Sequence, residues 1–412
     1  MHLAIFTSEF PSKAHTYFQW DLRALLESGF EISIFPVRSI DSSQWHYLNH
    51  ILDKNYLDRI KVRYIKPRFP LLDFTHPNRN LFSERASLIK KITSSALKFG
   101  IVPLIKTGIV ISQALHLVSE IGKEYDHILA YWGNYASTYA YLFHKWGGLS
   151  VPFSMILHAG TDLYRNQVFL DQKLLYSDNI FTVCNFNRKF VQELYPDIYD
   201  ELAPKLSIHQ LGLDLTAFPF ELKKREQRKL IAVGRLDNKK GYDYLLRSVS
   251  ELHSKGVILK LEIIGNGPEE NFLKRLSHQL GISEIVTFSG WLSLDEVKAR
   301  MQSATLLVHP SPCIGDAVPT VIKEAIASGL PVIGTNISGI PELLDYGRCG
   351  ILIPPADISA LTSAIKRLLE NDQERSRIAR LARLHAEANY DLNHTSKYLV
   401  EKIQNSSRIN RL

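Results

Sequence analysis

The alternation of short apolar runs with amphipathic segments is the feature that most restricts how this chain can fold. Five runs in the first half have the length and composition of buried strands: 3–7, 31–36, 127–131, 153–157 and 180–183. A second series of the same kind follows: 230–234, 261–265, 285–290, 305–310 and 331–335. Strands that alternate with helical segments are typical of parallel sheets covered by helices. We therefore predict an α/β protein with two Rossmann-like domains that face a central cleft.

The junction between the two series of strands sets the predicted domain boundary. The segment LGLDLTAFPF, 211–220, separates the last strand of the first series from the first strand of the second. We therefore predict an N-terminal domain over residues 1–213 and a C-terminal domain over residues 214–390. The last segment, about 391–412, has the pattern of a charged amphipathic helix.

Length and composition are those of an ordinary globular protein. The 412 residues suffice for two or three domains, and no run of 18 apolar residues lacks a charge. The N-terminus has no basic segment before its short apolar run, which argues against a signal peptide. Its three cysteines are isolated in the sequence, so neither a metal site nor a disulfide framework is expected. These features predict a cytoplasmic protein.

Positive charge is concentrated in residues 54–106. This segment carries twelve lysines or arginines and three acids, whereas the net charge of the whole chain is +7. A basic block favours a polyanionic partner, either a membrane, a nucleic acid or an acidic acceptor, although it also fits a solvated surface. Phe69, Phe74 and Phe82 lie among the charges, and aromatic rings favour a membrane interface. Because no nucleic-acid motif accompanies the block, we predict contact with an anionic membrane surface and no nucleic acid.

The segment 310–342 has the layout of a ligand crevice, in which a strand, a polar loop and a helix start precede a further strand. Asp316 and Glu324 stand eight positions apart, and their carboxylates suit sugar hydroxyls as hydrogen-bond acceptors. Pro319 is expected in the first turn of the helix, where its missing N–H costs nothing. The amides of Thr320 and Val321 would then point at an anion.

Three other strand ends carry polar or flexible residues. Arg235 and Lys240 follow the strand 230–234 and suit a diphosphate, although Arg235 also fits a surface ion pair with Asp237. Gly265 and Gly267 follow the next strand, which by itself is a weak signal of a ligand-binding loop. His158 ends the strand 153–157 and is expected to face a crevice, although a lone histidine is more often structural.

Together these segments resemble the retaining, nucleotide-sugar-dependent glycosyltransferases of family 4, which have the GT-B architecture. The resemblance implies that Glu324 binds the ribose of the donor and that Asp316 lies near the transferred sugar. Two departures occur in this motif, since relatives usually have glutamate where Asp316 stands and glycine where Ala317 stands.

The resemblance also implies roles for the remaining candidates. Arg235 and Lys240 would hold the diphosphate, the loop with Gly265 and Gly267 would line the nucleotide site, and His158 would contact the sugar or its phosphate. In the loop 8–18, His15 stands where relatives have glutamate, which leaves the acceptor open. The final helix is expected to cross back onto the N-terminal domain.

The predicted function is transfer of a sugar, with retention, from a nucleotide-diphosphate sugar to a hydroxyl of a glycan or lipid-linked acceptor. The process would be cell-envelope or exopolysaccharide synthesis, with the protein peripheral on the cytoplasmic face of the membrane. No cofactor or metal is expected, because Arg235 and Lys240 would stabilise the leaving diphosphate and no Asp-x-Asp motif is present. The alternatives are a non-catalytic sugar-nucleotide-binding partner of another transferase, or an epimerase or sugar-phosphate synthase of the same fold.

Overall fold

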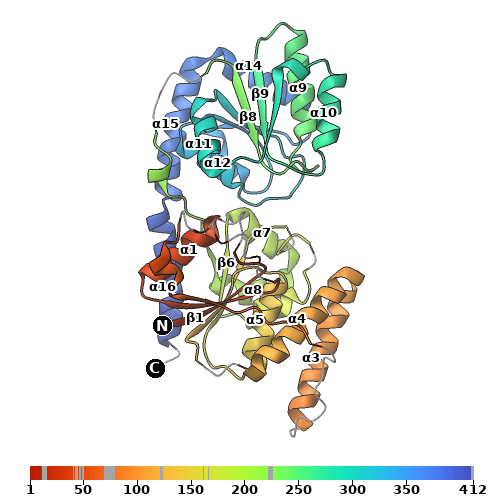
Figure 1. The fold of residues 1–412 in the computed structure, drawn as a ribbon, viewed down its shortest axis with the longest axis vertical. Helices are drawn as coiled ribbons and strands as arrows, with labels where there is room; N and C mark the ends of the chain where they lie inside the picture. Colours follow the sequence, from red (N-terminus) through yellow and green to blue (C-terminus); the bar gives the residue numbers. More distant parts are fainter. Residues whose placement is uncertain are drawn as a thin grey trace. The chain divides into compact units, whose positions relative to one another are not determined.

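The protein forms two compact units in its computed structural model (Figure 1). The first unit comprises Met1–Gly212 with Thr395–Leu412, and the second comprises Leu213–His394. The described residues are 1–11, 16–39, 41, 45, 48, 51–68, 79–120, 124–160, 162–165, 167–220 and 226–409. His15, Phe69 and Phe74 lie outside these ranges.

The first unit is built on a seven-stranded parallel sheet in the order β3-β2-β1-β4-β5-β6-β7. Its strands are β1 (His2–Thr7), β2 (Glu31–Pro36), β3 (Ile60–Val62), β4 (His127–Ala130), β5 (Phe153–Leu157), β6 (Asn179–Thr182) and β7 (Leu206–Ile208). Neighbouring residues of β1 are both buried, so both faces of the sheet are covered, as is usual for parallel sheets. The predicted α/β class is confirmed for this unit.

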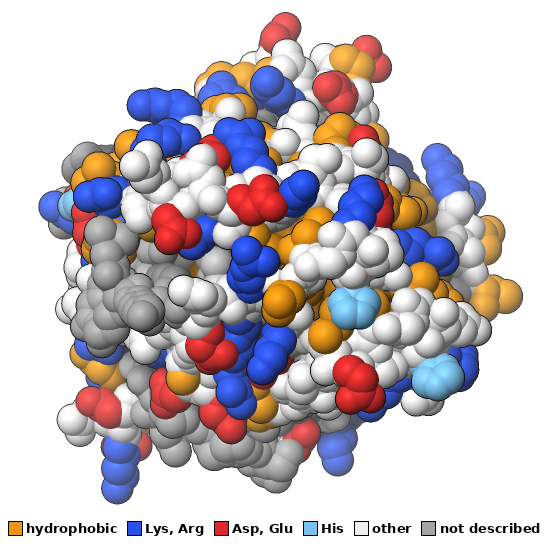
Figure 2. All heavy atoms as spheres, turned by 90° about the horizontal axis from the view of Figure 1, so that it is seen from above, with side chains coloured by type: hydrophobic (Ala, Val, Ile, Leu, Met, Phe, Trp, Pro, Cys, Tyr) orange, Lys and Arg blue, Asp and Glu red, His pale blue; other side chains and the backbone are white. Residues whose placement is uncertain are grey.

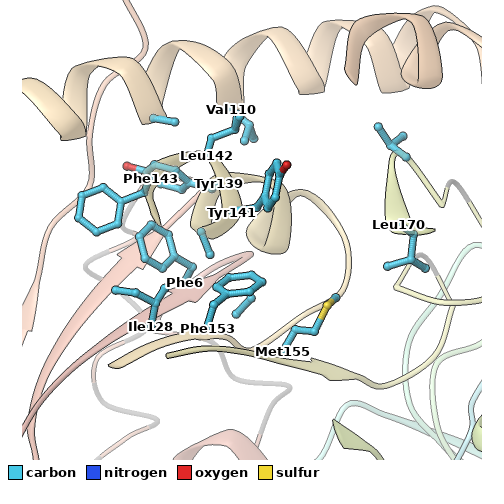
Figure 3. Close-up of a cluster of buried hydrophobic side chains, with 14 of the residues drawn as sticks. Phe6, Val110, Ile128, Tyr139, Tyr141, Leu142, Phe143, Phe153, Met155 and Leu170 are labelled. Carbon is cyan, nitrogen blue, oxygen red and sulfur yellow. The ribbon is translucent and has the colours of Figure 1, made fainter. Parts of the chain in front are cut away.

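The helices of the first unit pack on this sheet. They are α1 (Thr16–Glu27), α2 (Lys54–Leu57), α3 (Arg79–Leu97), α4 (Ile101–Glu120), α5 (Tyr135–Trp146), α6 (Leu170–Tyr176), α7 (Asn185–Leu194) and α8 (Tyr199–Leu202). One core cluster joins strand residues such as Phe6 and Met155 to Tyr139 of α5 and Val110 of α4 (Figure 3). Burial of this apolar area fixes the sheet against α4 and α5.

The second unit is a six-stranded parallel sheet in the order β10-β9-β8-β11-β12-β13. Its strands are β8 (Lys229–Val233), β9 (Lys260–Ile264), β10 (Val286–Gly290), β11 (Leu306–His309), β12 (Val332–Thr335) and β13 (Ile351–Ile353). The helices are α9 (Tyr242–Ser254), α10 (Glu270–Gln279), α11 (Leu294–Ser303), α12 (Thr320–Ala327), α13 (Ile340–Leu343), α14 (Ile358–Glu370) and α15 (Asp372–Asn389). On the molecular face drawn in Figure 2, basic side chains are interspersed with acidic and apolar ones.

The last helix, α16 (Leu392–Ile409), joins the first unit from Thr395 onward. Its Ser407 Oγ lies 3.0 Å from Nδ1 of the buried His127, and Asn179 Nδ2 donates to Ser406 Oγ at 2.7 Å. These contacts attach α16 to β4 and β6. The C-terminal segment thus completes the unit that the N-terminus begins.

Each sheet has one point where the order of strands reverses. The reversal lies between β1 and β4 in the first unit and between β8 and β11 in the second. The loops after such a pair of strands run in opposite directions, and ligands of open α/β sheets bind in the crevice this leaves beyond the carboxyl ends. The loops after β8 and β11 are therefore the first place to look for a site.

Candidate functional site

The loops that follow β8 and β11 meet at the reversal point of the second sheet. Gly241 is the N-cap residue of α9 and has a positive φ of 68°, and a Cβ at this position would lie 2.1 Å from the carbonyl oxygen of Pro310. Only glycine permits this approach, which brings Lys240 against the loop after β11. There the Lys240 ammonium pairs with the carboxylate of Asp316. Two predicted site residues from distant parts of the chain are thus in contact.

The charges around this ion pair are arranged to keep Asp316 ionised. Partial burial acts to raise the pKa of the carboxylate, but the positive charges of Lys240 and then Lys239 hold that pKa below its ordinary value. His309 ends β11, and burial together with Lys240 lowers its pKa to about 3, so its ring is neutral. Its Nε2 lies 3.2 Å from Ser311 Oγ. The sequence analysis left His309 without a role, and the structure places it beside the ion pair.

Arg235 lies on the same loop as Lys240 but is far more accessible. Its side chain is 71% exposed, and its Nε lies 3.8 Å from Asp237 Oδ2. Such a long, exposed ion pair contributes little to stability, so Arg235 is available to an incoming anion. Arg235 and Lys240 therefore offer two cations at the end of β8.

The loops after β8 and β9 touch through their backbones. Gly265 has a φ of +137°, and a Cβ there would lie 2.0 Å from the carbonyl oxygen of Gly234. A Cβ on Gly267 would lie 2.2 Å from the carbonyl oxygen of Leu236, whose N–H donates to Asn266 at 3.0 Å. Both predicted glycines are thus required by close approach of two loops. This contact fixes the position of the loop that carries Arg235.

Helix α12 directs its N-terminus at the same loop region. It begins at Thr320, with Pro319 as the preceding N-cap residue, one position earlier than the predicted first turn. The N–H of Ile322 bonds to the carbonyl of Pro319 at 3.1 Å. The amides of Thr320 and Val321 stand in the first turn, where helical N–H groups have no acceptor within the helix and attract anions.

Glu324 lies in the second turn of α12 and is half-buried. Burial raises the pKa of its carboxyl to about 7, and Lys323 and Lys298 oppose the rise only in part. A carboxylate held in a place where ionisation is costly is more common at functional sites than elsewhere. The predicted acceptor of a ligand hydroxyl is therefore in a perturbed environment.

The last predicted residue, His158, lies in the first unit at the end of β5. Its ring is buried among Tyr17, Tyr131 and Trp132, with ring centroids 5.2 to 5.6 Å away. Neither ring nitrogen has a hydrogen-bond partner in the described structure, and Nδ1 lies 3.5 Å from Asp162 Oδ2. Buried polar atoms are nearly always paired, so this histidine is suited to a ligand that completes its bonds.

Two buried ionisable residues were missed in the sequence analysis: Asp162, which lies next to His158, and Lys173, whose charge interacts with that of Asp162. Asp162 is fully buried, which raises its pKa. Lys173 of α6 is buried too, and its ammonium contacts Ser137 Oγ at 2.8 Å and the carbonyl of Gly133 at 3.2 Å. Burial lowers the pKa of Lys173 to about 7. Asp162 stands in the motif HAGTD after β5, which was a usable signal, whereas nothing in the local sequence marks Lys173.

Within the described ranges, no group of three or more histidine, cysteine, aspartate or glutamate side chains is placed to hold a metal ion.

Comparison with known proteins identifies the family. The profile of the family described as "Glycosyl transferases group 1" matches residues 215–385, nearly all of the second unit. Residues 215–385 of the chain match the group 1 glycosyltransferases. The predicted relationship to family 4 is confirmed.

Two curated relatives of this chain come from bacteria. It is 32% identical over 176 residues to the putative colanic acid biosynthesis glycosyltransferase WcaL of Salmonella typhimurium, an alignment that covers 41% of this chain and 43% of WcaL. It is 24% identical to the amylovoran biosynthesis glycosyltransferase AmsK of Erwinia amylovora, over 98% of this chain and 99% of AmsK. The first alignment thus spans less than half of that relative, and the second spans nearly all of it.

A solved structure supports the fold of this chain over both units. Anabaena Alr3699/HepE in complex with UDP superposes with a TM-score of 0.69 at 16% identity, covering 98% of this chain and 100% of that one. Likeness at this identity concerns the fold alone. It confirms that the two parallel sheets form the GT-B fold.

Proposed function

We propose that this chain transfers a sugar, with retention, from a nucleotide-diphosphate sugar to a hydroxyl group of a glycan or lipid-linked acceptor. The observation that carries the proposal is the contact between Lys240 and Asp316 at the reversal point of the second sheet. A cation that suits a phosphate and a carboxylate that suits a sugar hydroxyl meet there, beside the N-terminus of α12. In this cluster Lys240 suits the diphosphate of a sugar donor, and Asp316 suits a hydroxyl of its sugar.

In the proposed reaction the donor's diphosphate binds Arg235, Lys240 and the first amides of α12. The bond between the anomeric carbon and the diphosphate oxygen breaks, and a bond to the acceptor oxygen forms on the same face of the sugar. The proton of the acceptor hydroxyl passes to the departing phosphate. Cations and oriented amides stabilise the charge that develops on the leaving group. We propose that they do so without a divalent metal.

The other candidates complete the proposed site. Glu324 accepts a hydrogen bond from a ribose hydroxyl, and the loop with Gly265 and Gly267 lines the nucleotide. Asp316 lies near the transferred sugar. His158, whose ring nitrogens lack partners, contacts the sugar or its phosphate. Asp162 and Lys173 act as positioning residues, since Asp162 lies 3.5 Å from the histidine ring and Lys173 interacts electrostatically with Asp162.

The names of the relatives support a place in polysaccharide synthesis. WcaL and AmsK are named for the biosynthesis of colanic acid and amylovoran. We propose that this chain likewise builds an envelope or exported polysaccharide, and that it works at the cytoplasmic face of the membrane. The basic segment 54–106 supports membrane contact through exposed side chains such as those of Lys61, Arg63, Lys66 and Arg68. The side chains of Phe69, Phe74 and Phe82 lie outside the described part.

Two other functions fit a GT-B fold. A non-catalytic sugar-nucleotide-binding partner of another transferase would bind the donor without cleaving it, and Asp316 and Ala317 in place of the usual pair keep this alternative open. A nucleotide-sugar epimerase would convert the donor without an acceptor. Slow hydrolysis of the donor to a free sugar and nucleoside diphosphate separates both alternatives from a transferase.

A thermal-shift panel of nucleotide sugars tests the proposal. Each donor is added to the purified chain in the presence of EDTA. At a hundredfold excess over its Kd, the matching donor adds about 2.7 kcal/mol to the free energy of unfolding. We expect one base and one sugar to stand out. If no nucleotide sugar raises the melting temperature more than its nucleoside monophosphate does, the proposed donor site is wrong.

Glu324→Gln is expected to weaken donor binding roughly tenfold to a hundredfold at about pH 8, because a hydrogen bond to a charged group contributes about 1.5–3 kcal/mol. The loss should shrink below about pH 6, where wild-type Glu324, with a pKa of about 7, is mostly neutral. Isothermal titration calorimetry at both pH values measures the effect.

The same variant also has an expected effect on stability. Because the folded-state pKa of Glu324 is raised, its contribution to stability is full at low pH and is lost as pH rises through about 7. The Glu324→Gln variant should therefore gain in melting temperature relative to wild type between about pH 5 and pH 8. Glu284→Gln, which replaces an exposed glutamate in the segment after α10, serves as the control. Equal donor affinities of wild type and variant at about pH 8 would remove Glu324 from the site.

A further inference from the structure

Helices α3 and α4 are joined by a very short turn, formed by Lys98, Phe99 and Gly100. The N–H of Phe99 bonds to the carbonyl of Ala96 and that of Gly100 to the carbonyl of Leu97, both at 3.0 Å. Gly100 has a φ of +106°, which suits glycine, and it allows α4 to begin at Ile101. The turn with the adjoining ends of the two helices, residues 97–106, is here called the hairpin tip (Figure 1).

The hairpin tip exposes large apolar side chains. Five of the fifteen exposed large hydrophobic residues in the described chain fall within nine consecutive positions: Leu97, Phe99, Ile101, Val102 and Ile105. Four of these five side chains are 58% to 69% exposed. A surface helix normally turns polar residues outward, and scattered single apolar residues need no explanation. A cluster of this density marks an interaction surface.

The opposite side of α4 is anchored in the core. Pro103, Thr107 and Val110 are buried, and Val110 points into the aromatic cluster of the first unit (Figure 3). In the described part of the chain, α4 is the one helix long and apolar enough to cross a bilayer. Because almost half of it is buried against its own unit, it cannot cross as it stands. Its buried apolar residues therefore pack in the core, and its exposed apolar residues at the tip are available to an outer partner.

The charges around the hairpin tip select the chemistry of that partner. From Arg85 to Ser119 the sequence has five lysines or arginines and no acid. Lys98 and Lys106 lie in the tip itself and are exposed. Two copies of this chain that met through the tip would bring these lysines together, which is unfavourable. A surface that is apolar beneath a layer of negative charge, as in an anionic bilayer, matches both features.

The hairpin tip lies at the functional edge of the first unit. Lys106 Nζ lies 5.8 Å from the ring centroid of Tyr135, the first residue of α5, which follows β4. Near the end of α3, Ser95 Oγ accepts from the N–H of Phe169, in the connection that follows β5. Both contacts are with segments at the carboxyl ends of strands, the edge that also carries His158.

We propose that the hairpin tip inserts into the surface of an anionic lipid bilayer, with Leu97, Ile101 and Ile105 below the headgroups and Lys98 and Lys106 among them. Insertion of the hairpin tip holds the edge of the first unit that carries His158 at the lipid surface. A lipid-linked molecule in that surface can then contact this edge. It differs from simple attraction of the basic segment 54–106, because apolar insertion persists when salt screens the charges. The inference does not depend on the proposed transferase activity.

The test uses the full chain and vesicles of equimolar phosphatidylglycerol and phosphatidylcholine. The triple variant Leu97→Ser, Ile101→Ser and Ile105→Ser is compared with wild type by co-sedimentation. We expect its partition coefficient to fall roughly a hundredfold or more, since full burial of one large apolar side chain changes an equilibrium about tenfold. The matched control, Ile258→Ser, Phe272→Ser and Leu384→Ser, removes three exposed apolar side chains from the second unit and should bind like wild type.

Further measurements separate apolar insertion from other modes of contact. The fluorescence of a tryptophan introduced by Phe99→Trp should be quenched by vesicles whose lipids are brominated in their acyl chains. Vesicles of ordinary lipids should not quench it. Lys98→Gln with Lys106→Gln should reduce the preference for phosphatidylglycerol, by roughly fivefold for each charge. Salt at about 1 M should weaken wild-type binding without abolishing it. Melting temperature and circular dichroism confirm that each variant is folded.

Three results would overturn the proposal. Equal vesicle binding by the tip variant and the wild type would show that the tip does not insert. Complete release by high salt would reduce the contact to charge attraction. Wild-type self-association in the ultracentrifuge that the tip variant loses, with no vesicle binding by either protein, would assign the tip to a second copy of the chain.

Discussion

Lys240→Ala is expected to lower kcat roughly a hundredfold to a thousandfold with a much smaller change in KM. Removing one group that stabilises developing negative charge in a preorganised site typically has an effect of this size. Lys240 also pairs with Asp316, so its loss leaves that carboxylate to the opposing influence of burial, and the pKa of Asp316 should rise. Steady-state rates of nucleoside diphosphate release with the matching donor measure the change.

A control separates this effect from general loss of charge. Lys274→Ala removes an exposed lysine of α10 that pairs with Glu270 at 2.7 Å and should leave kcat unchanged. The double variant Lys240→Ala and Asp316→Asn should lose less than the sum of the single effects, because the two groups act as a unit. A Lys240→Ala enzyme with wild-type kcat would exclude Lys240 from stabilisation of the leaving group.

Gly265→Ala is expected to lower the free energy of unfolding by roughly 3 kcal/mol and to weaken donor binding as well. Its φ of +137° strains any L-residue, at about 1–3 kcal/mol. In addition, the new Cβ would collide with the carbonyl oxygen of Gly234, which lies 2.0 Å away and belongs to backbone that cannot rotate aside. The loops after β8 and β9 must then separate, which displaces the loop that carries Arg235 and Lys240.

Gly281→Ala is the matched control for this prediction. Gly281 also has a positive φ, +68°, but a Cβ there meets nothing within 4 Å. Its substitution should cost only the backbone strain of about 1–2 kcal/mol and should leave donor binding intact. Chemical denaturation and calorimetry on both variants give the two quantities. Equal losses of stability at the two glycines would contradict the proposed contact between the loops.

The fold was predicted mainly from the pattern of short apolar runs. The three strands that this pattern did not predict share one property. The ten strands predicted from the sequence all exist, with ends shifted by no more than one residue. Strands β3, β7 and β13 were not predicted because each has only three residues, too few to establish a period of two. Parallel pairing to a neighbouring strand, a non-local interaction, decides their conformation.

The candidate site was predictable where a motif placed polar residues at the end of a strand. The contact between Lys240 and Asp316 joins residues 76 positions apart, so no local pattern predicts it. Lys173 is similar, because its partners Ser137 and Gly133 belong to α5 and the turn before it. The outward half of α4 was missed for another reason. Its buried and its outward residues are both apolar, so only exposure distinguishes the residues of the hairpin tip from those beneath them.

The most direct test of the central claim is to follow donor cleavage by proton NMR, with the matching nucleotide sugar and EDTA present. We predict slow release of nucleoside diphosphate in which the freed sugar first appears with the donor's anomeric configuration, before mutarotation. Lys240→Ala should abolish this signal, and the acceptor, once known, should accelerate it. Release of the opposite anomer, a strict requirement for manganese or magnesium, or no cleavage of any nucleotide sugar would contradict a retaining, metal-independent glycosyltransferase.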